Sequence, residues 1–173
     1  MSSAPALLRI AVGVVVGRHK ANSPWADQVW RPVAVLAGLP DAKAWTLLDS
    51  DALSATFYAG AAEIELYRSE TDGYRRNLAS GKPSVWVALE VTGGDPPCDI
   101  VAVTADPAEG EGLTEPAQAI VEAVPMPEQV QHALAAFVAE HHVERVFEKR
   151  ERDRANPEAL ARRRPTLRRR DER

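Results

Sequence analysis

The sequence is poor in cysteine, and its single example, Cys98, can form neither an intrachain disulfide nor a thiolate metal or iron–sulfur site. Cys98 lies between Pro97 and Asp99, without a basic neighbour in sequence that would stabilise a thiolate. A cysteine nucleophile is therefore not indicated. A chain without disulfides suits a reducing compartment, and we expect a cytoplasmic protein.

The sequence also lacks a long apolar run. The run from Ile10 to Gly17 is far shorter than the about 20 residues that a membrane span needs. Arg9 interrupts the apolar residues, no basic segment precedes them, and no small-residue cleavage site follows, so a signal peptide is not indicated. We predict no membrane association and interpret this run as a first β-strand.

Sequence motifs for phosphate binding and hydrolysis are missing as well. There is no G-x-x-x-x-G-K-[ST], no G-x-G-x-x-G and no G-x-S-x-G. His132, His141 and His142 fall in a predicted helix, but no two of them have the spacing that places ligands on one helix face. We therefore predict no catalytic residue, no cofactor site and no metal site.

What the sequence does contain is typical of one soluble globular domain: 173 residues, 45% hydrophobic and 27% charged. The charge is divided unevenly. Residues 1–143 hold 9 basic and 18 acidic side chains, a net charge of -9, whereas residues 144–173 hold 12 and 7, a net charge of +5. We predict a single domain over residues 1–147, followed by a basic charged tail, residues 148–173, that is helical or disordered.

Short β-branched or alternating runs predict strands at Ile10–Val16, Val29–Leu36, Ala62–Tyr67, Ser84–Thr92, Ile100–Thr104 and Ala119–Val124. Pro32 cannot donate a ladder hydrogen bond, so the second of these strands either lies at a sheet edge or begins at Pro32. Ala59-Gly60 is interpreted as a hairpin turn before Ala62. In Ala62–Tyr67, Glu63 and Glu65 mark a solvated strand face, although two carboxylates on one face could also serve acid–base catalysis.

Three helices are expected. Ser69 begins a short one, and Asp106 caps another that Gly110 and Gly112 would leave short or frayed. The main helix opens at Pro127 and carries one apolar face for a sheet, formed by Val130, Leu134, Phe137, Val138 and His141. The whole pattern predicts an α+β fold: a mainly antiparallel sheet packed by one main C-terminal helix, with short helices and a charged C-terminal tail.

Three groups of side chains are candidates for partner binding. Trp25, which follows Pro24 in a loop, is a candidate anchor, while Trp30 is expected to pack in a sheet. A second group surrounds the start of the short helix and could hold an anion or a partner's carboxylate: Arg68, Tyr74, Arg75 and Arg76. The alternative is that Arg75 and Arg76 are merely solvated and Tyr74 is packed.

The third group is the tail, whose two triple-arginine clusters suit phosphates or an acidic protein surface. These clusters are Arg162, Arg163 and Arg164, and Arg168, Arg169 and Arg170. The body is acidic and lacks a basic-aromatic platform, so a protein partner is favoured over nucleic acid.

The chain resembles a bacterial family of small proteins of unknown function, from about Val12 to the tail. The resemblance is carried by Val12–Lys20, Asn22–Leu36, Phe57–Leu89, Val103–Pro107, Val124–Pro127 and Phe137–Val143. The chain departs from its relatives at the glycine-rich Glu109–Gly112, where they look more helical. Members tend to be encoded near formate dehydrogenase genes and their maturation factors, which implies an accessory role, and no catalytic residue is established for the family.

From this resemblance we expect a non-catalytic cytoplasmic accessory protein that binds a redox enzyme or its assembly factors, linked to formate dehydrogenase maturation. The alternative is a nucleic-acid-associated regulator that acts through the arginine-rich tail.

Overall fold

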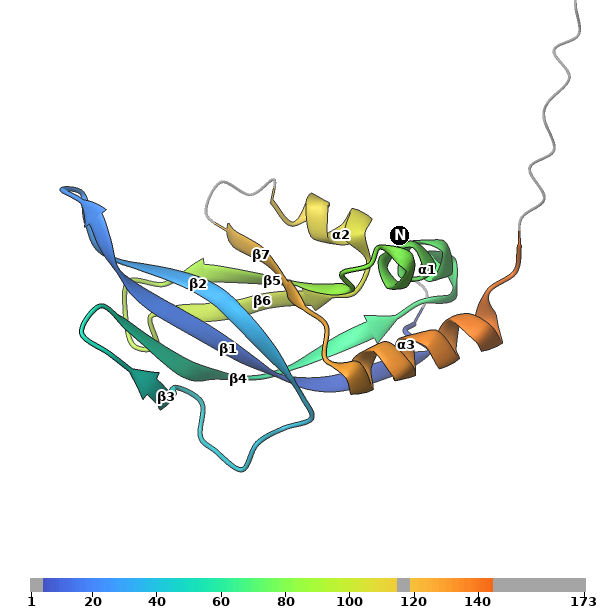
Figure 1. The fold of residues 1–173 in the computed structure, drawn as a ribbon, viewed down its shortest axis with the longest axis horizontal. Helices are drawn as coiled ribbons and strands as arrows, with labels where there is room; N and C mark the ends of the chain where they lie inside the picture. Colours follow the sequence, from blue (N-terminus) through green and yellow to red (C-terminus); the bar gives the residue numbers. More distant parts are fainter. Residues whose placement is uncertain (1–4, 115–118, 145–173) are drawn as a thin grey trace, which may run out of the picture. The chain divides into compact units, whose positions relative to one another are not determined.

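The computed structural model describes residues 5–114 and 119–144 (Figure 1). Its elements, in chain order, are β1 (Leu8–Ser23), β2 (Ala26–Ala37), β3 (Thr46–Ser50), β4 (Ser54–Leu66), the 3-10 turn η1 (Arg68–Glu70), α1 (Thr71–Ala79), β5 (Ser84–Val91), β6 (Cys98–Thr104), α2 (Pro107–Gly112), β7 (Ala119–Pro125) and α3 (Glu128–His141). The fold is a mixed α+β fold with mainly antiparallel sheets, as predicted. The described residues up to His142 belong to one compact unit. The six arginines of the predicted tail clusters lie outside the described residues.

The strands form two sheets, whereas the sequence pattern predicted one. The first has the strand order β2-β1-β4-β3, and the second has the order β6-β5-β7. The two sheets lie against each other, with β2 beside β7 and β4 beside β6 (Figure 1). At the β2–β7 side, the guanidinium of Arg31 lies 3.8 Å from the carboxylate of Glu122. Alternation identifies the buried face of a strand but does not say which sheet the strand joins, which explains the error.

The core lies between the two sheets and under the helices. Val12, Val14 and Val16 of β1 are fully buried, as are Val85 and Val87 of β5. β1 lies between β2 and β4 in the first sheet, and its successive residues from Val12 to Gly17 are all buried, so both faces of the strand are covered over this stretch. This explains why its sequence is a continuous run of valines instead of an alternating one.

Two predictions about β2 and β4 had different outcomes. Pro32 does lie in the edge strand β2, opposite Val16 and next to a register shift, and not at the start of the strand, so the edge alternative is confirmed. The predicted hairpin at Ala59-Gly60 is wrong, because β4 continues through both residues. Gly60 has φ +140°, and the pairing of β4 with β1 shifts register between Val14 and Val15. The glycine therefore allows a β-bulge and makes no turn.

The helices cover one end of the core. The predicted apolar face of α3 is buried at Val130, Leu134 and Phe137, and it contacts α1 as well as β2. The ring of Phe137 meets Tyr74 of α1 edge-on, at 6.1 Å between centroids. α1 begins at Thr71, after η1, and no side chain caps it, so the prediction that Ser69 begins this helix is wrong by one 3-10 turn.

The short helix α2 is formed despite its glycines. Its N-cap Asp106 accepts a hydrogen bond from the Ala108 N–H at 3.2 Å, as predicted. Gly110 is buried against the indole of Trp86, and a Cβ atom at Gly110 would lie only 2.2 Å from Cγ of that ring. The glycine interpreted as a weak point of the helix is thus what lets α2 lie directly on β5.

Candidate functional site

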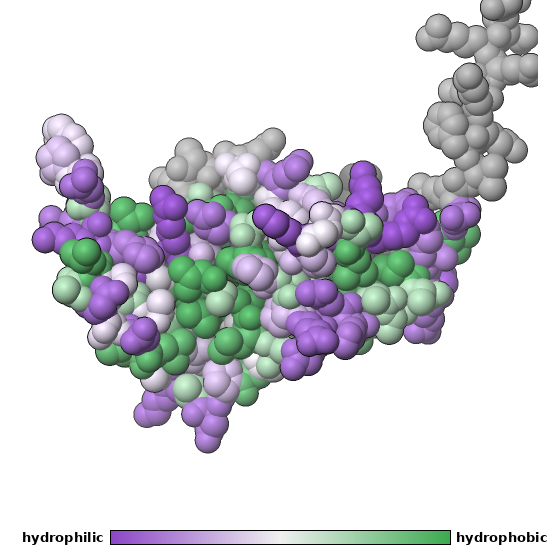
Figure 2. Space-filling view, viewed as in Figure 1, coloured by the Kyte–Doolittle hydropathy of each residue, from purple (hydrophilic) through white to green (hydrophobic). Residues whose placement is uncertain are grey.

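The turn between β1 and β2 carries the most exposed large apolar side chain in the described part of the chain. Pro24 and Trp25 form this turn, with Ser23 and Ala26 paired across its base. Trp25 is 93% exposed, and its backbone N–H donates to Oγ of Ser23 at 3.2 Å. Figures 1 and 2 show the turn projecting from the body at the upper left.

Trp30, only five residues later, has a different environment. Its ring meets Trp45 edge-on, with 5.8 Å between centroids, and lies 5.8 Å from Phe57. The guanidinium of Arg18 stands 6.0 Å from the Trp30 ring and 5.5 Å from the Phe57 ring, within range of a cation–π contact. Trp30 therefore packs in the first sheet, which confirms its predicted role, and leaves Trp25 as the tryptophan of this pair that faces solvent.

A second turn, between β3 and β4, presents Leu53, which is 68% exposed. Asp51 holds this turn: one carboxylate oxygen accepts the backbone N–H groups of Leu53 and Ser54, each at 2.7 Å, and the other accepts the Ser54 hydroxyl at 2.9 Å. These hydrogen bonds lower the pKa of Asp51, and the bond from the Leu53 N–H has the largest effect. The Lys20 N–H donates to the Leu53 carbonyl at 3.0 Å, which fixes the turn to β1.

A groove of about 490 Å³ lies between these two turns. Leu53 and Asp51 line it on one side, and the residues that flank Trp25, Ser23 and Ala26, line it on the other. Charged side chains of both signs also line the groove, among them Arg18, Lys20 and Asp27. We call Trp25, Leu53 and this groove the turn surface.

A second recess, also of about 490 Å³, lies where α1 and α2 meet β5. Its lining includes two cationic side chains, Arg76 and Lys82, and the half-buried indole of Trp86. The remaining lining residues are Asn77, Ser80, Ser84, Pro107, Ala108 and Glu111. We call this recess the α1–α2 pocket. It lies toward the opposite end of the molecule from the β1–β2 turn (Figure 1).

The structure separates the predicted arginine–tyrosine group instead of gathering it. Tyr74 is 1% exposed, and its hydroxyl accepts the Tyr67 N–H at 3.1 Å, so Tyr74 is a core residue and not the partner contact that we proposed. Burial raises its pKa to about 12. Arg75 lies 3.8 Å from the Asp72 carboxylate at an exposed position, and Arg68 is exposed in η1. Within this group, Arg76 is the residue that lines the pocket.

The sequence pattern predicted no role of its own for Asn77, which lines this pocket. Its buried amide donates to the carbonyls of Ser84 and Ala105, each at 2.8 Å, and accepts the Ser84 N–H at 3.0 Å. One side chain thus joins α1 to the start of β5 and to the segment before α2. The available signal was its position three residues after Tyr74, on the same helix face.

The remaining candidate groups are engaged in structural contacts. Arg9 lies 3.7 Å from Glu63 and 3.0 Å from Glu65, so these two carboxylates share a cation on an exposed strand face. Tyr67 also donates its hydroxyl to Glu65, and this bond raises the pKa of Tyr67. Cys98 is buried, which raises the pKa of its thiol to about 11. At this pKa the thiol stays protonated, which disfavours nucleophilic chemistry.

The histidines are dispersed. His141 packs on Phe137 with 4.5 Å between ring centroids, and Nδ1 of His142 lies 3.2 Å from the Thr71 hydroxyl. Over residues 5–114 and 119–144, no three histidine, cysteine, aspartate or glutamate side chains cluster in a geometry that could hold a metal ion. Over the same residues, no helix is both long enough and apolar enough to cross a bilayer.

The strands and helices described above define a small α+β protein. A family model described as a protein of unknown function, DUF3305, matches residues 11–151, and the chain belongs to this family. The expected membership of a family of unknown function is thereby confirmed. Comparison with curated proteins gave no match, and neither did comparison with solved structures. The turn surface and the α1–α2 pocket both lie within the matched residues.

Proposed function

We propose that this protein is a non-catalytic accessory protein that binds a partner protein through the turn surface. The observation that carries the proposal is Trp25, 93% exposed on a projecting two-residue turn. Tryptophan is among the residues that most often supply the binding energy of an interface, because a partner that covers its large ring buries much apolar surface. Here the ring makes no ring–ring contact within the described residues that would explain its position.

The turn surface is also held in a fixed geometry, which reduces the entropy lost on binding. Trp25 sits on a turn closed by the Ser23–Ala26 pair, and Leu53 on one closed by the three hydrogen bonds to Asp51. Two apolar anchors then flank a groove lined by charges of both signs. This arrangement of apolar contacts with a polar surround is typical of a protein interface.

As the partner we propose a component of a formate dehydrogenase or one of its maturation factors, in the cytoplasm. This choice follows the family resemblance given above. A nucleic-acid-associated regulator that uses the tail arginines, from Arg162 to Arg170, is the alternative. The acidic excess of residues 1–143 disfavours binding of nucleic acid to the body of the protein.

The test is to purify the formate dehydrogenase subunits and maturation factors of the same genome and to titrate each against the protein by biolayer interferometry. We expect one of them to bind. Trp25→Ala should weaken this binding by at least about tenfold, as for an interface hot spot. Leu39→Ala is the matched control, because Leu39 is also exposed, at 54%, but does not line the groove.

Two results would count against the proposal. If none of these proteins binds, the proposed partner is wrong. If one binds and Trp25→Ala weakens it no more than Leu39→Ala does, the turn surface is not the interface. A gel-shift titration with duplex DNA and with RNA tests the alternative, which requires a complex that weakens as salt concentration rises.

A further inference from the structure

We propose that the α1–α2 pocket binds a small organic monoanion, whose carboxylate is held by Arg76 and Lys82 and whose apolar part lies against Trp86 and Pro107. This site is separate from the turn surface and does not depend on the proposed partner. Its volume of about 490 Å³ falls within the range of small-molecule sites, about 300–1,000 Å³.

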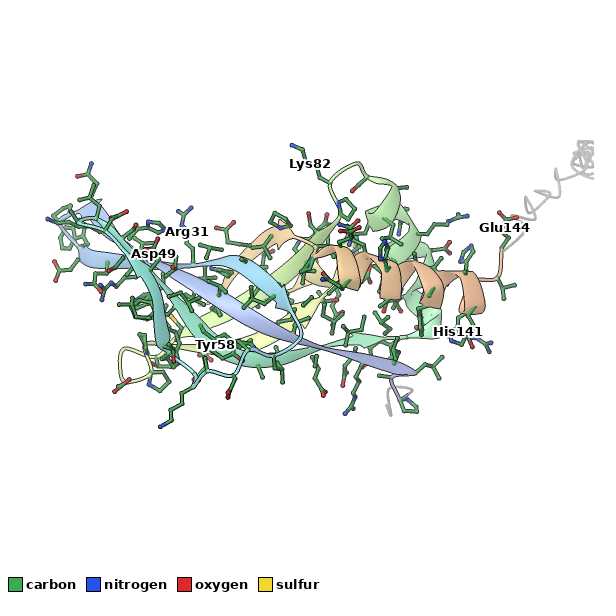
Figure 3. The ribbon with its side chains drawn as sticks, turned by 60° about the horizontal axis from the view of Figure 1, so that its bottom comes forward. Arg31, Asp49, Tyr58, Lys82, His141 and Glu144 are labelled. Atoms are coloured by element: carbon green, nitrogen blue, oxygen red, sulfur yellow. The ribbon has the colours of Figure 1, made fainter. Side chains whose placement is uncertain are left out.

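The first support is the state of the two cations. Arg9, Arg31 and Arg75 each lie within 4 Å of a carboxylate. Arg76 and Lys82 have no carboxylate partner within 4 Å among the described residues, and unlike the other unpaired cations they line this pocket together. An arginine on a recess is well suited to a carboxylate, because its planar donors bind both oxygens at once. Figure 3 shows Lys82 on the loop between α1 and β5, with its side chain extending outward from the loop.

The second support is that the walls of the pocket are fixed before any ligand arrives. The Asn77 amide makes three hydrogen bonds that tie α1 to β5 and to the segment before α2. On the opposite wall, α2 lies on Trp86 through Gly110, where a side chain would not fit. The fold therefore fixes the backbone that carries Arg76 on α1 and the indole of Trp86 on β5. This favours binding, because little conformational entropy is lost when a ligand binds.

The lining also defines the class of ligand. Arg76 and Lys82 contribute two positive charges and Glu111 one negative charge, so the lining favours a single negative charge over several. Trp86 and Pro107 offer apolar surface beside the cations, which suits a ring or a short hydrocarbon portion. A monocarboxylate with an aromatic or aliphatic group satisfies both conditions.

Benzoate is a suitable probe, with benzamide as its neutral isostere. Isotope-labelled full-length protein would be titrated with each, and the indole N–H signal of Trp86 and the amide signals of Asn77 would be followed by NMR. We expect benzoate to shift these signals in a saturable manner, and benzamide to bind at least about tenfold more weakly, since it lacks the charge that the two cations recognise.

Arg76→Gln and Lys82→Gln should each weaken benzoate binding by about tenfold, the effect of one charge-assisted contact. Arg75→Gln is the matched control: it removes the adjacent arginine of the same helix, which does not line the pocket, and should leave the affinity unchanged. All three positions are exposed, so the variants should fold. The proposal is overturned if benzoate shifts neither signal, if benzamide binds equally well, or if Arg76→Gln behaves as Arg75→Gln does.

Discussion

Replacing Gly110 with alanine tests the packing of α2 on β5 most directly. A Cβ atom at this position would lie 2.2, 2.5 and 2.6 Å from Cγ, Cδ1 and Cδ2 of Trp86, whereas carbon atoms in favourable contact are about 3.5–4.0 Å apart. Either the helix or the indole must therefore move by more than 1 Å or so. Overpacking of this kind costs about 1–3 kcal/mol, which exceeds the up to about 1 kcal/mol that alanine gains over glycine in a helix.

Gly112 of the same helix supplies the matched control. No heavy atom lies within 4 Å of a Cβ placed there, and its backbone does not adopt positive φ. Gly112→Ala should therefore be neutral or stabilise the protein by up to about 1 kcal/mol through helix propensity and lower entropy of the unfolded chain.

Urea unfolding followed by circular dichroism measures both variants. We expect a lower midpoint for Gly110→Ala and an equal or higher one for Gly112→Ala, with unchanged slopes. A Gly110→Ala protein as stable as the wild type would refute the close contact with Trp86, and with it the fixed wall of the α1–α2 pocket. If the contact is real, replacing the indole with a smaller side chain in Trp86→Leu should restore part of the stability lost in Gly110→Ala. A double-mutant cycle would measure this coupling.

Three further predictions concern titrating groups. Burial raises the pKa of Tyr74 from 10 to about 12, so the stability that depends on its neutral hydroxyl is complete below pH 10 and is lost as pH rises toward 12. Unfolding measured at rising alkaline pH should show the free energy of unfolding decrease by about 2–3 kcal/mol, and this decrease should be absent in Tyr74→Phe. Burial also raises the pKa of Asp106, so ionisation of this carboxyl group in the folded protein above pH 3.8 costs stability. Asp106→Asn should keep the helix cap without the charge, and this variant should melt at or above the wild-type temperature at neutral pH. Asp106→Ala removes the cap and should lower the free energy of unfolding by about 1 kcal/mol. The hydrogen bonds to Asp51 lower the pKa of its carboxyl group, so above pH 3.8 they stabilise the β3–β4 turn, and they are lost when acid protonates the carboxylate. NMR should then show that the Leu53 and Ser54 amides lose protection from hydrogen exchange in acid. Unchanged protection of these amides would contradict this role of Asp51.

The sequence was sufficient for features that depend on local chemistry. Pro32 identified an edge strand because a residue without an N–H cannot sit in the middle of a sheet. The alternating Val85, Val87 and Leu89 gave the buried face of β5, and Asp106 gave the start of α2 through its side-chain oxygen. Each of these inferences needs only the residue and its immediate neighbours.

It was insufficient where distant segments meet. Gly60 is interpreted as a turn in isolation, and only its pairing with β1 makes it a bulge. The α1–α2 pocket combines Arg76 with Trp86 and Pro107, which come from a helix, a strand and a second helix, so no spacing in the sequence indicates it. The residue types around the start of α1 suggest an anion site that includes Tyr74, but Tyr74 is buried, as the alternative of a packed tyrosine expects.

The central place of β1 has a consequence for how the protein is made. β1 pairs with β4 along most of its length, from Leu8 opposite Leu66 to His19 opposite Ser54, yet it leaves the ribosome well before any residue of β4. In this interval the β1–β2 hairpin can form, but the backbone groups on the other edge of β1 remain unpaired. An open edge of this kind will accept any suitable strand, including β4 of a second nascent chain. Strand-exchanged dimers should therefore accumulate when nascent chains are crowded and elongation between β1 and β4 is slow, whereas rapid completion of β4 should favour the monomeric pairing.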